Sequence, residues 1–219
     1  MPIVGAACGS MIQLQFAAAG FLGQNISQMA MAIGNGVINS ILSSATYTGT
    51  STGLGIGVGT STGKILGGIT IGPTVGNLIF LNMTAQGLLG EKAQAFASAV
   101  GAGIANYIAS AAIVTGASTV VGIGVGTGTI VGVVGQAVGA QVFAMMTAQG
   151  LLGENARNVA DAVGAGVASA IGMSTVTTTI TGAAVGTVPP AFPPIPSTGT
   201  DIGRIIWYQI DSSGILSAH

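Results

Sequence analysis

The feature that most constrains this chain is an internal repeat. The string MTAQGLLGE occupies residues 83–91 and returns at residues 146–154, 63 positions later. Each occurrence is followed at the same distance by AVGAG, at residues 99–103 and 162–166. A string repeated at fixed spacing indicates a repeated supersecondary unit, so we expect similar units that pack against one another.

A more divergent copy precedes these two. It contains AAGFLGQ at residues 18–24 and AIGNGV at residues 32–37, and it lies 67 positions before the second copy. We therefore expect three copies, with approximate boundaries at residues 5–60, 61–127 and 128–188. Together they predict one triple-repeat domain over residues 1–188.

The second copy has the pattern of a helix pair. The apolar residues from Gly76 to Met83 suit a buried first helix. This helix should end at the glycines of residues 87–90, because glycine is favoured just after a helix C-terminus. Glu91 is expected to begin a second helix, in which apolar residues recur at spacings of three and four. The short connection makes the two helices antiparallel neighbours.

Glycine-rich segments lie between the copies. GIGVGT occupies residues 55–60 and 122–127, and a looser version, TVTTTITGAAVGT, occupies residues 175–187. Apolar residues that alternate with glycine have the period of two of a strand, so we expect strands or extended loops here rather than helices. Because glycine weakens a strand, its frequency indicates tight curvature or the close approach of another backbone.

The fold class predicted from these patterns is α+β. Three tandem repeats of a helix hairpin plus a glycine-rich β segment should be followed by a proline-rich, extended C-terminal arm over residues 189–219. The arm leads to IGRIIWYQI at residues 202–210, which has the aromatic and β-branched content of a strand. Two alternatives remain open: this strand could join a neighbour's sheet or fold back on its own chain.

Glycines inside the predicted second helices are candidate contact residues. Each costs roughly 0.8–1 kcal/mol relative to alanine in a helix interior, so the close approach of another backbone should offset this cost. That backbone could belong to another copy within the chain or to another subunit. The candidate assembly contacts are Gly101, Gly103, Gly164 and Gly166 in the helices and Trp207 and Tyr208 in the terminal strand.

Charged residues are scarce. The chain has four basic and five acidic residues, or 4% of its length, against about 25% in an ordinary soluble domain. Such a surface is poorly protected against association, which favours a chain covered by partners. Without clustered Lys and Arg, we exclude a dedicated nucleic-acid binder. No basic stretch of a secretory signal precedes Lys64, so we expect the chain to stay in the cytoplasm where it is made.

Groups that perform chemistry are equally few. The one histidine, His219, is the last residue, and the one cysteine, Cys8, is expected to be a small buried hydrophobe. Glu154, Arg157 and Asp161 have the spacing of an exposed helix ladder. We therefore predict no catalytic residue, no metal site, no cofactor and no enzymatic activity.

Two other classes of protein remain as alternatives. Residues 99–125 are uncharged and apolar, so the first alternative is an integral membrane or pore-forming protein. The basic flanking residues that orient spanning helices are missing. GVGTSTGK at residues 57–64 resembles a phosphate-binding loop, which raises a nucleotide-binding module. This segment has Val58 where that motif has its first glycine, and Ile65 where it has Ser or Thr.

The strings GIGVGTSTGKILG, MTAQGLLGE and AIGNGVINSI together resemble small, uncharged, repeat-containing virion structural proteins of large tailed bacteriophages. The resemblance covers most of residues 1–188. It implies a capsid, neck, tail or baseplate component, located in the virion after synthesis in the host cytoplasm. Its partners would be other copies of itself and other virion structural proteins. Because such proteins act through subunit contacts, the resemblance assigns no functional residue.

Overall fold

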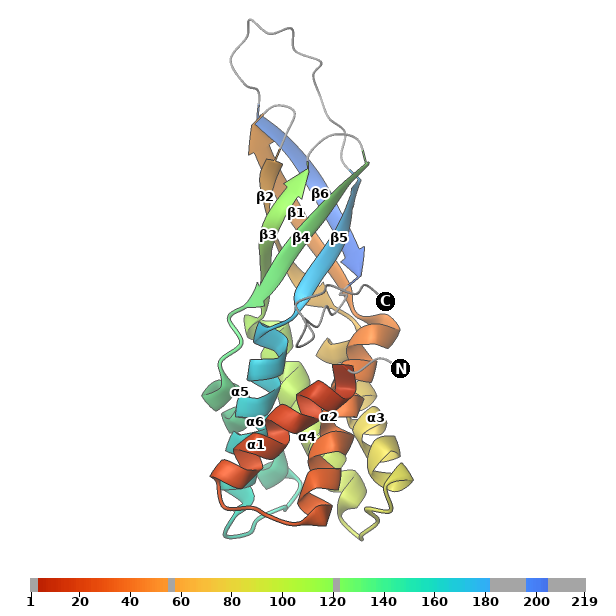
Figure 1. Ribbon diagram of the computed structural model, residues 1–219, viewed down its shortest axis with the longest axis vertical. Coiled ribbons are helices and arrows are strands. Elements are labelled where there is room, and N and C mark those ends of the chain that lie inside the picture. Colours follow the sequence, from red (N-terminus) through yellow and green to blue (C-terminus); the bar gives the residue numbers. More distant parts are fainter. Residues whose placement is uncertain (1–3, 55–57, 120–122, 182–195, 205–219) are drawn as a thin grey trace, which may run out of the picture.

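The structure is a computed structural model that describes residues 4–54, 58–119, 123–181 and 196–204. Within these residues, six α-helices and six strands separate into a helical bundle and a barrel stacked end to end (Figure 1). This segregation confirms the predicted α+β class. The order is α1 (Val4–Ala18), α2 (Gln24–Ser44), β1 (Thr46–Leu54), β2 (Val58–Leu66), the 3-10 helix η1 (Gly68–Thr70), α3 (Gly72–Ala85), α4 (Ala93–Ala111), β3 (Ile113–Thr119), β4 (Ile123–Val131), α5 (Gly135–Ala148), α6 (Ala156–Gly172), β5 (Thr175–Thr181) and β6 (Pro196–Arg204).

The helices close into a ring. Each of α1 to α5 packs against the helix that follows it, and α6 packs back against α1. The pairs α1–α2, α3–α4 and α5–α6 are hairpins whose loops all lie at the end of the bundle far from the barrel (Figure 1). The helix pair predicted in the second copy is therefore present. Its first helix begins at Gly72 rather than Gly76, because Pro73 is tolerated in a first turn, where its missing N–H has no partner to lose.

The first helix of each pair ends in the same kind of glycine turn. The N–H of Gly87 donates to the carbonyl of Thr84 at 3.0 Å, and the N–H of Leu88 donates to the carbonyl of Met83 at 2.9 Å. These bonds satisfy carbonyls that a helix end leaves unpaired, and they need a residue in the left-handed region. The prediction that α3 ends at these glycines is confirmed. The left-handed glycines are Gly20, Gly87 and Gly150, with φ of 83°, 73° and 69°.

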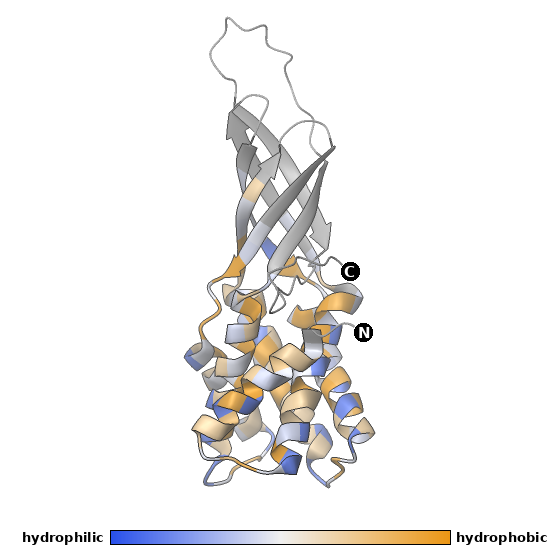
Figure 2. Ribbon diagram, viewed as in Figure 1, coloured by the Kyte–Doolittle hydropathy of each residue, from blue (hydrophilic) through white to orange (hydrophobic). Residues whose placement is uncertain are grey.

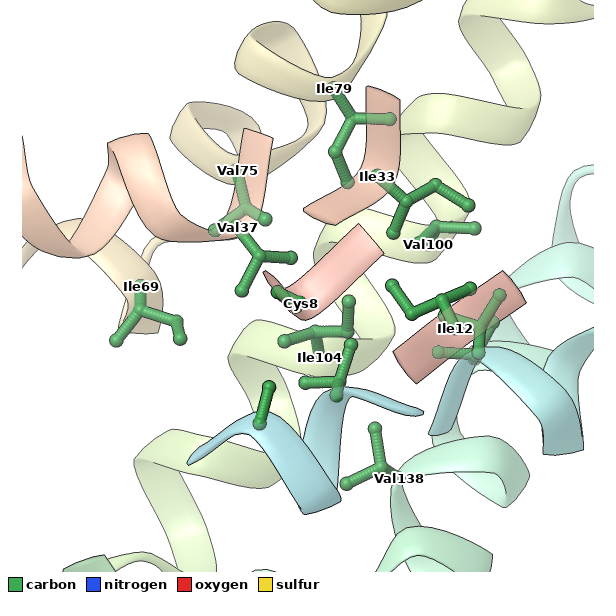
Figure 3. Packing of buried hydrophobic residues seen from close by; sticks show 14 of the residues in the cluster. Cys8, Ile12, Ile33, Val37, Ile69, Val75, Ile79, Val100, Ile104 and Val138 are labelled. Carbon is green, nitrogen blue, oxygen red and sulfur yellow. The ribbon is translucent and has the colours of Figure 1, made fainter. Parts of the chain in front are cut away.

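The ring encloses the hydrophobic core (Figure 3). Corresponding positions of the three pairs carry β-branched side chains of similar size, all 0% exposed. They are Ile12, Ile79 and Val142 on the first helices, and Ile33, Val100, Val163, Val37, Ile104 and Val167 on the second. Burial of one such side chain contributes about 1.5–3 kcal/mol, so apolar packing holds the ring together. Cys8 occupies on α1 the position of Val75 on α3 and Val138 on α5, and it is buried as predicted.

The strands of the described segments form a closed antiparallel barrel. Each strand pairs with its neighbours in sequence, and β6 pairs with β1 to complete the cylinder. Of the glycine-rich segments at residues 55–60 and 122–127, the described residues 58–60 and 123–127 belong to strands β2 and β4, as their glycine alternation indicated. Residues 55–57 and 122 lie outside the described residues. The partners of β2 and β4 are strands of the same chain.

The base of the barrel identifies its inward face. Ile65, Val114 and Ile130 are buried, whereas Lys64 next to Ile65 is exposed. Because side chains alternate along a strand, glycines two residues away lie on the same face as the buried residues. Those glycines are Gly63, Gly116 and Gly128. A six-stranded barrel is narrower than the eight-stranded one that side chains just fill, so its interior favours glycine.

One of these glycines illustrates the close approach of backbones that the sequence predicts. A Cβ added to Gly128 would lie 2.8 Å from the carbonyl oxygen of Thr115 on the adjacent strand. That separation is shorter than a normal van der Waals contact, so a larger residue would push the two strands apart.

The C-terminal strand differs from its prediction in position. β6 runs from Pro196 to Arg204, six residues earlier than the strand expected at residues 202–210, and it pairs with both β1 and β5. Pro196 is compatible with a strand because it is the first residue. The described part therefore follows the second alternative, in which the segment folds back on its own chain. Residues 189–195 and 205–219, with Trp207, Tyr208 and His219, lie outside the described residues.

The apolar stretch at residues 99–125 is divided between several elements. Residues 99–111 form the C-terminal part of α4, residues 113–119 form β3, and β4 begins at Ile123. Among the described helices, none combines the length and the apolar character required to cross a membrane.

Candidate assembly surface

Within the part of the chain that the structure describes, the side chains that could carry chemistry do not gather in one place. Within the described ranges, no three His, Cys, Asp or Glu residues lie close enough to hold a metal ion. Burial raises the pKa of the Cys8 thiol from 9.0 to about 12. A thiol that stays protonated in an apolar core is a poor nucleophile.

One predicted charge pair is present at the surface. Arg157 Nε donates to Asp161 Oδ2 at 2.8 Å, one turn apart on α6, and the guanidinium lies 5.4 Å from the centre of the Phe143 ring. Glu154, the third member of the predicted ladder, precedes the helix. Both paired side chains are more than 40% exposed, so the pair is worth less than about 1 kcal/mol.

The segment that resembles a phosphate loop is part of the barrel. Residues 58–64 belong to β2, where Lys64 lies opposite Thr48 on one side and Ile113 on the other. A phosphate loop instead connects a strand to a helix and directs free backbone N–H groups at the ligand. In β2, strands on both sides take part in the hydrogen-bonded ladder.

The glycines predicted as contact residues lie inside the helical ring. A Cβ on Gly101 would lie 2.6 Å from the Cα of Gly76, and one on Gly164 would lie 2.7 Å from the Cα of Gly139. These contacts join the two helices of one pair, α3 to α4 and α5 to α6. The same contact joins α1 to α2, where a Cβ on Gly34 would lie 2.6 Å from the Cα of Gly9.

The second glycine of each motif faces the next pair in the ring. A Cβ on Gly103 would lie 2.6 Å from the backbone nitrogen of Val142 on α5, and one on Gly166 would lie 2.7 Å from that of Ile12 on α1. The structure thus places Gly101, Gly103, Gly164 and Gly166 between helices of the same chain. Gly103 and Gly166 face another copy of the repeat, whereas Gly101 and Gly164 face the other helix of their own copy.

A different set of residues occupies the exposed end of the bundle. Leucines in the three hairpin loops, at corresponding positions, project into solvent. Leu22 is 78% exposed, Leu89 67% and Leu152 68%. These loops are the three at the bottom of Figure 1, and Figure 2 shows hydrophobic and hydrophilic residues side by side there. We call this end of the bundle the loop face.

The loop face contains a depression. This depression of about 1000 Å³ has apolar side chains from all three helix pairs in its wall, including Met29, Phe96, Met146, Leu89 and Leu152. Polar residues of the loops and of the start of α2 also line it: Gln24, Asn25, Gln86, Lys92, Glu154 and Asn155. Protein–protein contact surfaces combine apolar and polar side chains in this way.

Charge is concentrated near the same end. Five of the nine charged residues belong to the second and third hairpin loops or to the start of α6. They are Glu91, Lys92, Glu154, Arg157 and Asp161. The first pair has Gln24 and Asn25, at the start of α2, at the positions of Glu91 and Lys92, and so carries no charge there. The three loops therefore share a glycine turn and an exposed leucine but differ in charge.

The exposed leucines were missed by reasoning from the sequence. The sequence contains an indication of them, because a leucine recurs at this position in every copy of the loop motif. A leucine beside a glycine turn can equally cover the end of its own helix, as the partly buried Leu88 and Leu151 do. Only the structure separates the covered leucine from the exposed one next to it.

No protein family model, no curated protein and no solved structure matches this chain.

Proposed function

We propose that this chain is a non-enzymatic structural subunit of a large assembly, and that the assembly is a bacteriophage virion. The subunit acts through contacts with its neighbours in the capsid, neck, tail or baseplate. We also propose that its three helix-pair and strand-pair segments are tandem copies of one unit. One chain then presents the threefold surface that other assemblies build from three chains.

The observation that carries this proposal is the equivalent exposure of Leu22, Leu89 and Leu152 in the three hairpin loops at one end of the bundle. Leu89 and Leu152 also line a depression there. Single exposed leucines need no explanation, but three at corresponding positions of one face indicate a surface that is covered in use. Burial of each leucine against a neighbour contributes about 1.5–3 kcal/mol.

The composition supports the same proposal. With nine charged residues and a formal net charge of −1, the chain has little electrostatic repulsion to keep it apart from other proteins. A subunit that is permanently incorporated in an assembly does not require that repulsion.

The two lysines of the chain provide a test. Lys64 is exposed on β2 of the barrel, and Lys92 is exposed on the loop face, so they mark opposite halves of the molecule. Purified virions should be treated with an amine-reactive cross-linker and digested for mass spectrometry. We expect peptides that join Lys92 to another virion protein or to another copy of this chain.

A matched control is Lys92→Arg, which keeps the positive charge but removes the reactive amine. It should abolish only the cross-links from the loop face. The proposal is overturned if purified particles lack this chain, or if neither lysine gives an intermolecular cross-link in them.

A further inference from the structure

We propose that β6 is an exchangeable strand, and that it completes the barrel of a second copy of this chain when two copies lie side by side. This inference rests on the proposed function, since it requires neighbouring copies, and it deepens that function by naming the partner and the surface. The surface consists of the facing edges of β1 and β5, which β6 joins within one chain (Figure 1).

Each helix pair is associated with two strands that pair with each other. β2 and β3 flank α3 and α4 in the sequence, and β4 and β5 flank α5 and α6. The first helix pair follows the same plan, because β1 comes directly after α2 and pairs with β6. Here, however, β6 is the last described element of the chain. The first unit is therefore completed by a strand from the opposite end of the chain.

The pairing of β6 is made mainly with that distant strand. β6 pairs with β1 along its whole length, Pro196–Arg204, but with β5 only over Thr200–Arg204. The strand that precedes β6 in the sequence thus forms the shorter of its two ladders. What β6 recognises is largely the first unit, and every copy of the chain carries an identical one.

The connection that leads to β6 is longer than those of the other two hairpins. Three residues join β1 to β2 (55–57) and β3 to β4 (120–122), whereas fourteen residues, 182–195, separate β5 from β6. Fourteen extended residues span up to about 45–50 Å, and the overhang of β6 beyond β5, residues 196–199, uses only about 13 Å of that span. A nine-residue strand is roughly 30 Å long. The connection can therefore carry β6 beyond its own barrel to that of a neighbour.

The length of this connection also affects the balance between the closed and the exchanged form. An exchanged β6 makes the same ladders with β1 and β5, so the two forms differ mainly in the entropy of the connection. The effective concentration of a tethered strand falls roughly as the −3/2 power of the tether length, so a fourteen-residue tether favours closure about tenfold less than a three-residue tether. Reciprocal exchange between adjacent copies leaves neither barrel with a free edge, as in a domain-swapped dimer.

The test uses two full-length variants, Thr50→Cys and Thr200→Cys. Thr50 on β1 lies opposite Thr200 on β6, and opposite residues of antiparallel strands are close enough to form a disulfide. The two variants should be unfolded in urea, mixed, refolded under reducing conditions and then oxidised, when Cys8 is buried again. Because each variant carries only one introduced thiol, a disulfide between positions 50 and 200 requires β6 of one copy to lie on β1 of the other.

We expect a disulfide-linked dimer on non-reducing gel electrophoresis, with a yield that increases with the concentration of the chain. The matched control is Thr115→Cys mixed with Thr129→Cys, because these residues lie opposite each other on β3 and β4, which three residues connect. We expect at least about tenfold less linked product from this control, in line with the tether lengths. Circular dichroism should confirm that every variant keeps its helices.

Equal yields of linked product from the two mixtures at every concentration would overturn this inference. The measurement is made on the purified chain, so it does not depend on whether virions contain it. Particles that lack the chain would end the proposed function whatever the refolding shows. Conversely, a chain that does not exchange β6 can still be cross-linked through Lys92 to another virion protein. Failure of the exchange is therefore distinguishable from failure of the proposed function.

Discussion

The backbones of Gly139 on α5 and Gly164 on α6 approach so closely that a Cβ on Gly164 would lie 2.7 Å from the Cα of Gly139. We predict that Gly164→Ala lowers the free energy of unfolding by about 1–3 kcal/mol, because the helices must separate to admit the methyl group. The measurement is urea denaturation followed by circular dichroism.

The same helix offers a control for this variant. Gly172, the last residue of α6, would place a Cβ with no neighbour within 4 Å. Gly172→Ala should be neutral or should stabilise the chain by up to about 1 kcal/mol through helix propensity. Equal effects of the two substitutions would contradict the packing argument.

Cys8 should give the chain a distinctive dependence on alkaline pH. Below pH 9 the thiol is protonated in both the folded and the unfolded state. Burial raises its pKa from 9.0 to about 12 in the folded state, so between these values only the unfolded state loses the proton. The free energy of unfolding should then fall by about 1.4 kcal/mol for each pH unit.

Cys8→Ala provides the comparison. The variant is less stable because the substitution leaves a cavity. Its free energy of unfolding should, however, lack the decrease between pH 9 and 12 that the thiol causes. Parallel pH profiles for the two proteins would show that the thiol ionises as easily in the core as in the unfolded chain.

We predict that a substitution that disrupts β6 destabilises the barrel but not the helical bundle. Ile202 lies opposite Thr48 on β1 and Thr179 on β5. Ile202→Pro removes a backbone N–H from the ladder, so we expect faster amide hydrogen exchange in β1 and β5. The helices should keep their protection. Ile202→Val is the matched control, and unchanged exchange in β1 after Ile202→Pro would contradict the closure of the barrel by β6.

Asp161 combines an exposed ion pair with a buried oxygen. Its Oδ1 has no exposed surface and no hydrogen-bond partner within the described residues, while its Oδ2 accepts from Arg157. An unpaired buried oxygen costs about 1–3 kcal/mol, more than an exposed ion pair returns. Asp161→Ser, which introduces the residue found at the corresponding position 98, should therefore leave the melting temperature unchanged or raise it.

A second substitution separates the two contributions. Arg157→Met breaks the same ion pair, keeps apolar contact with Phe143 and leaves the buried oxygen in place. It should lower stability by less than about 1 kcal/mol. A clear loss of stability in Asp161→Ser would mean that the carboxylate has a favourable role that its contacts do not explain.

Local patterns in the sequence predicted the individual helices and strands better than the contacts that close the helical ring and the barrel. The turn at Gly87, the strand at residues 58–66 and the burial of Cys8 follow from the preferences of neighbouring residues. The contacts of α1 with α6 and of β1 with β6 join segments from the two ends of the chain. No periodic pattern in the sequence predicts such contacts.

The position of β6 was missed for a physical reason. Residues 196–201, PSTGTD, contain no aromatic residue, and their proline, glycine and aspartate are depleted in strands. Their strand structure comes from pairing with β1 on one side and β5 on the other. Neighbours supplied by the tertiary fold thus outweigh the preference of the segment itself.

The pairing of β1 with β6 has a consequence for how the protein is made. A chain leaves the ribosome from its N-terminus, so residues 46–54 emerge long before residues 196–204 exist. At about 5–20 residues per second, β1 waits roughly 7–30 s for its last partner. During that interval its free edge could pair with another nascent chain. The alternation of threonine, serine and glycine in TYTGTSTGL gives this edge little apolar surface to hold such a mistaken partner.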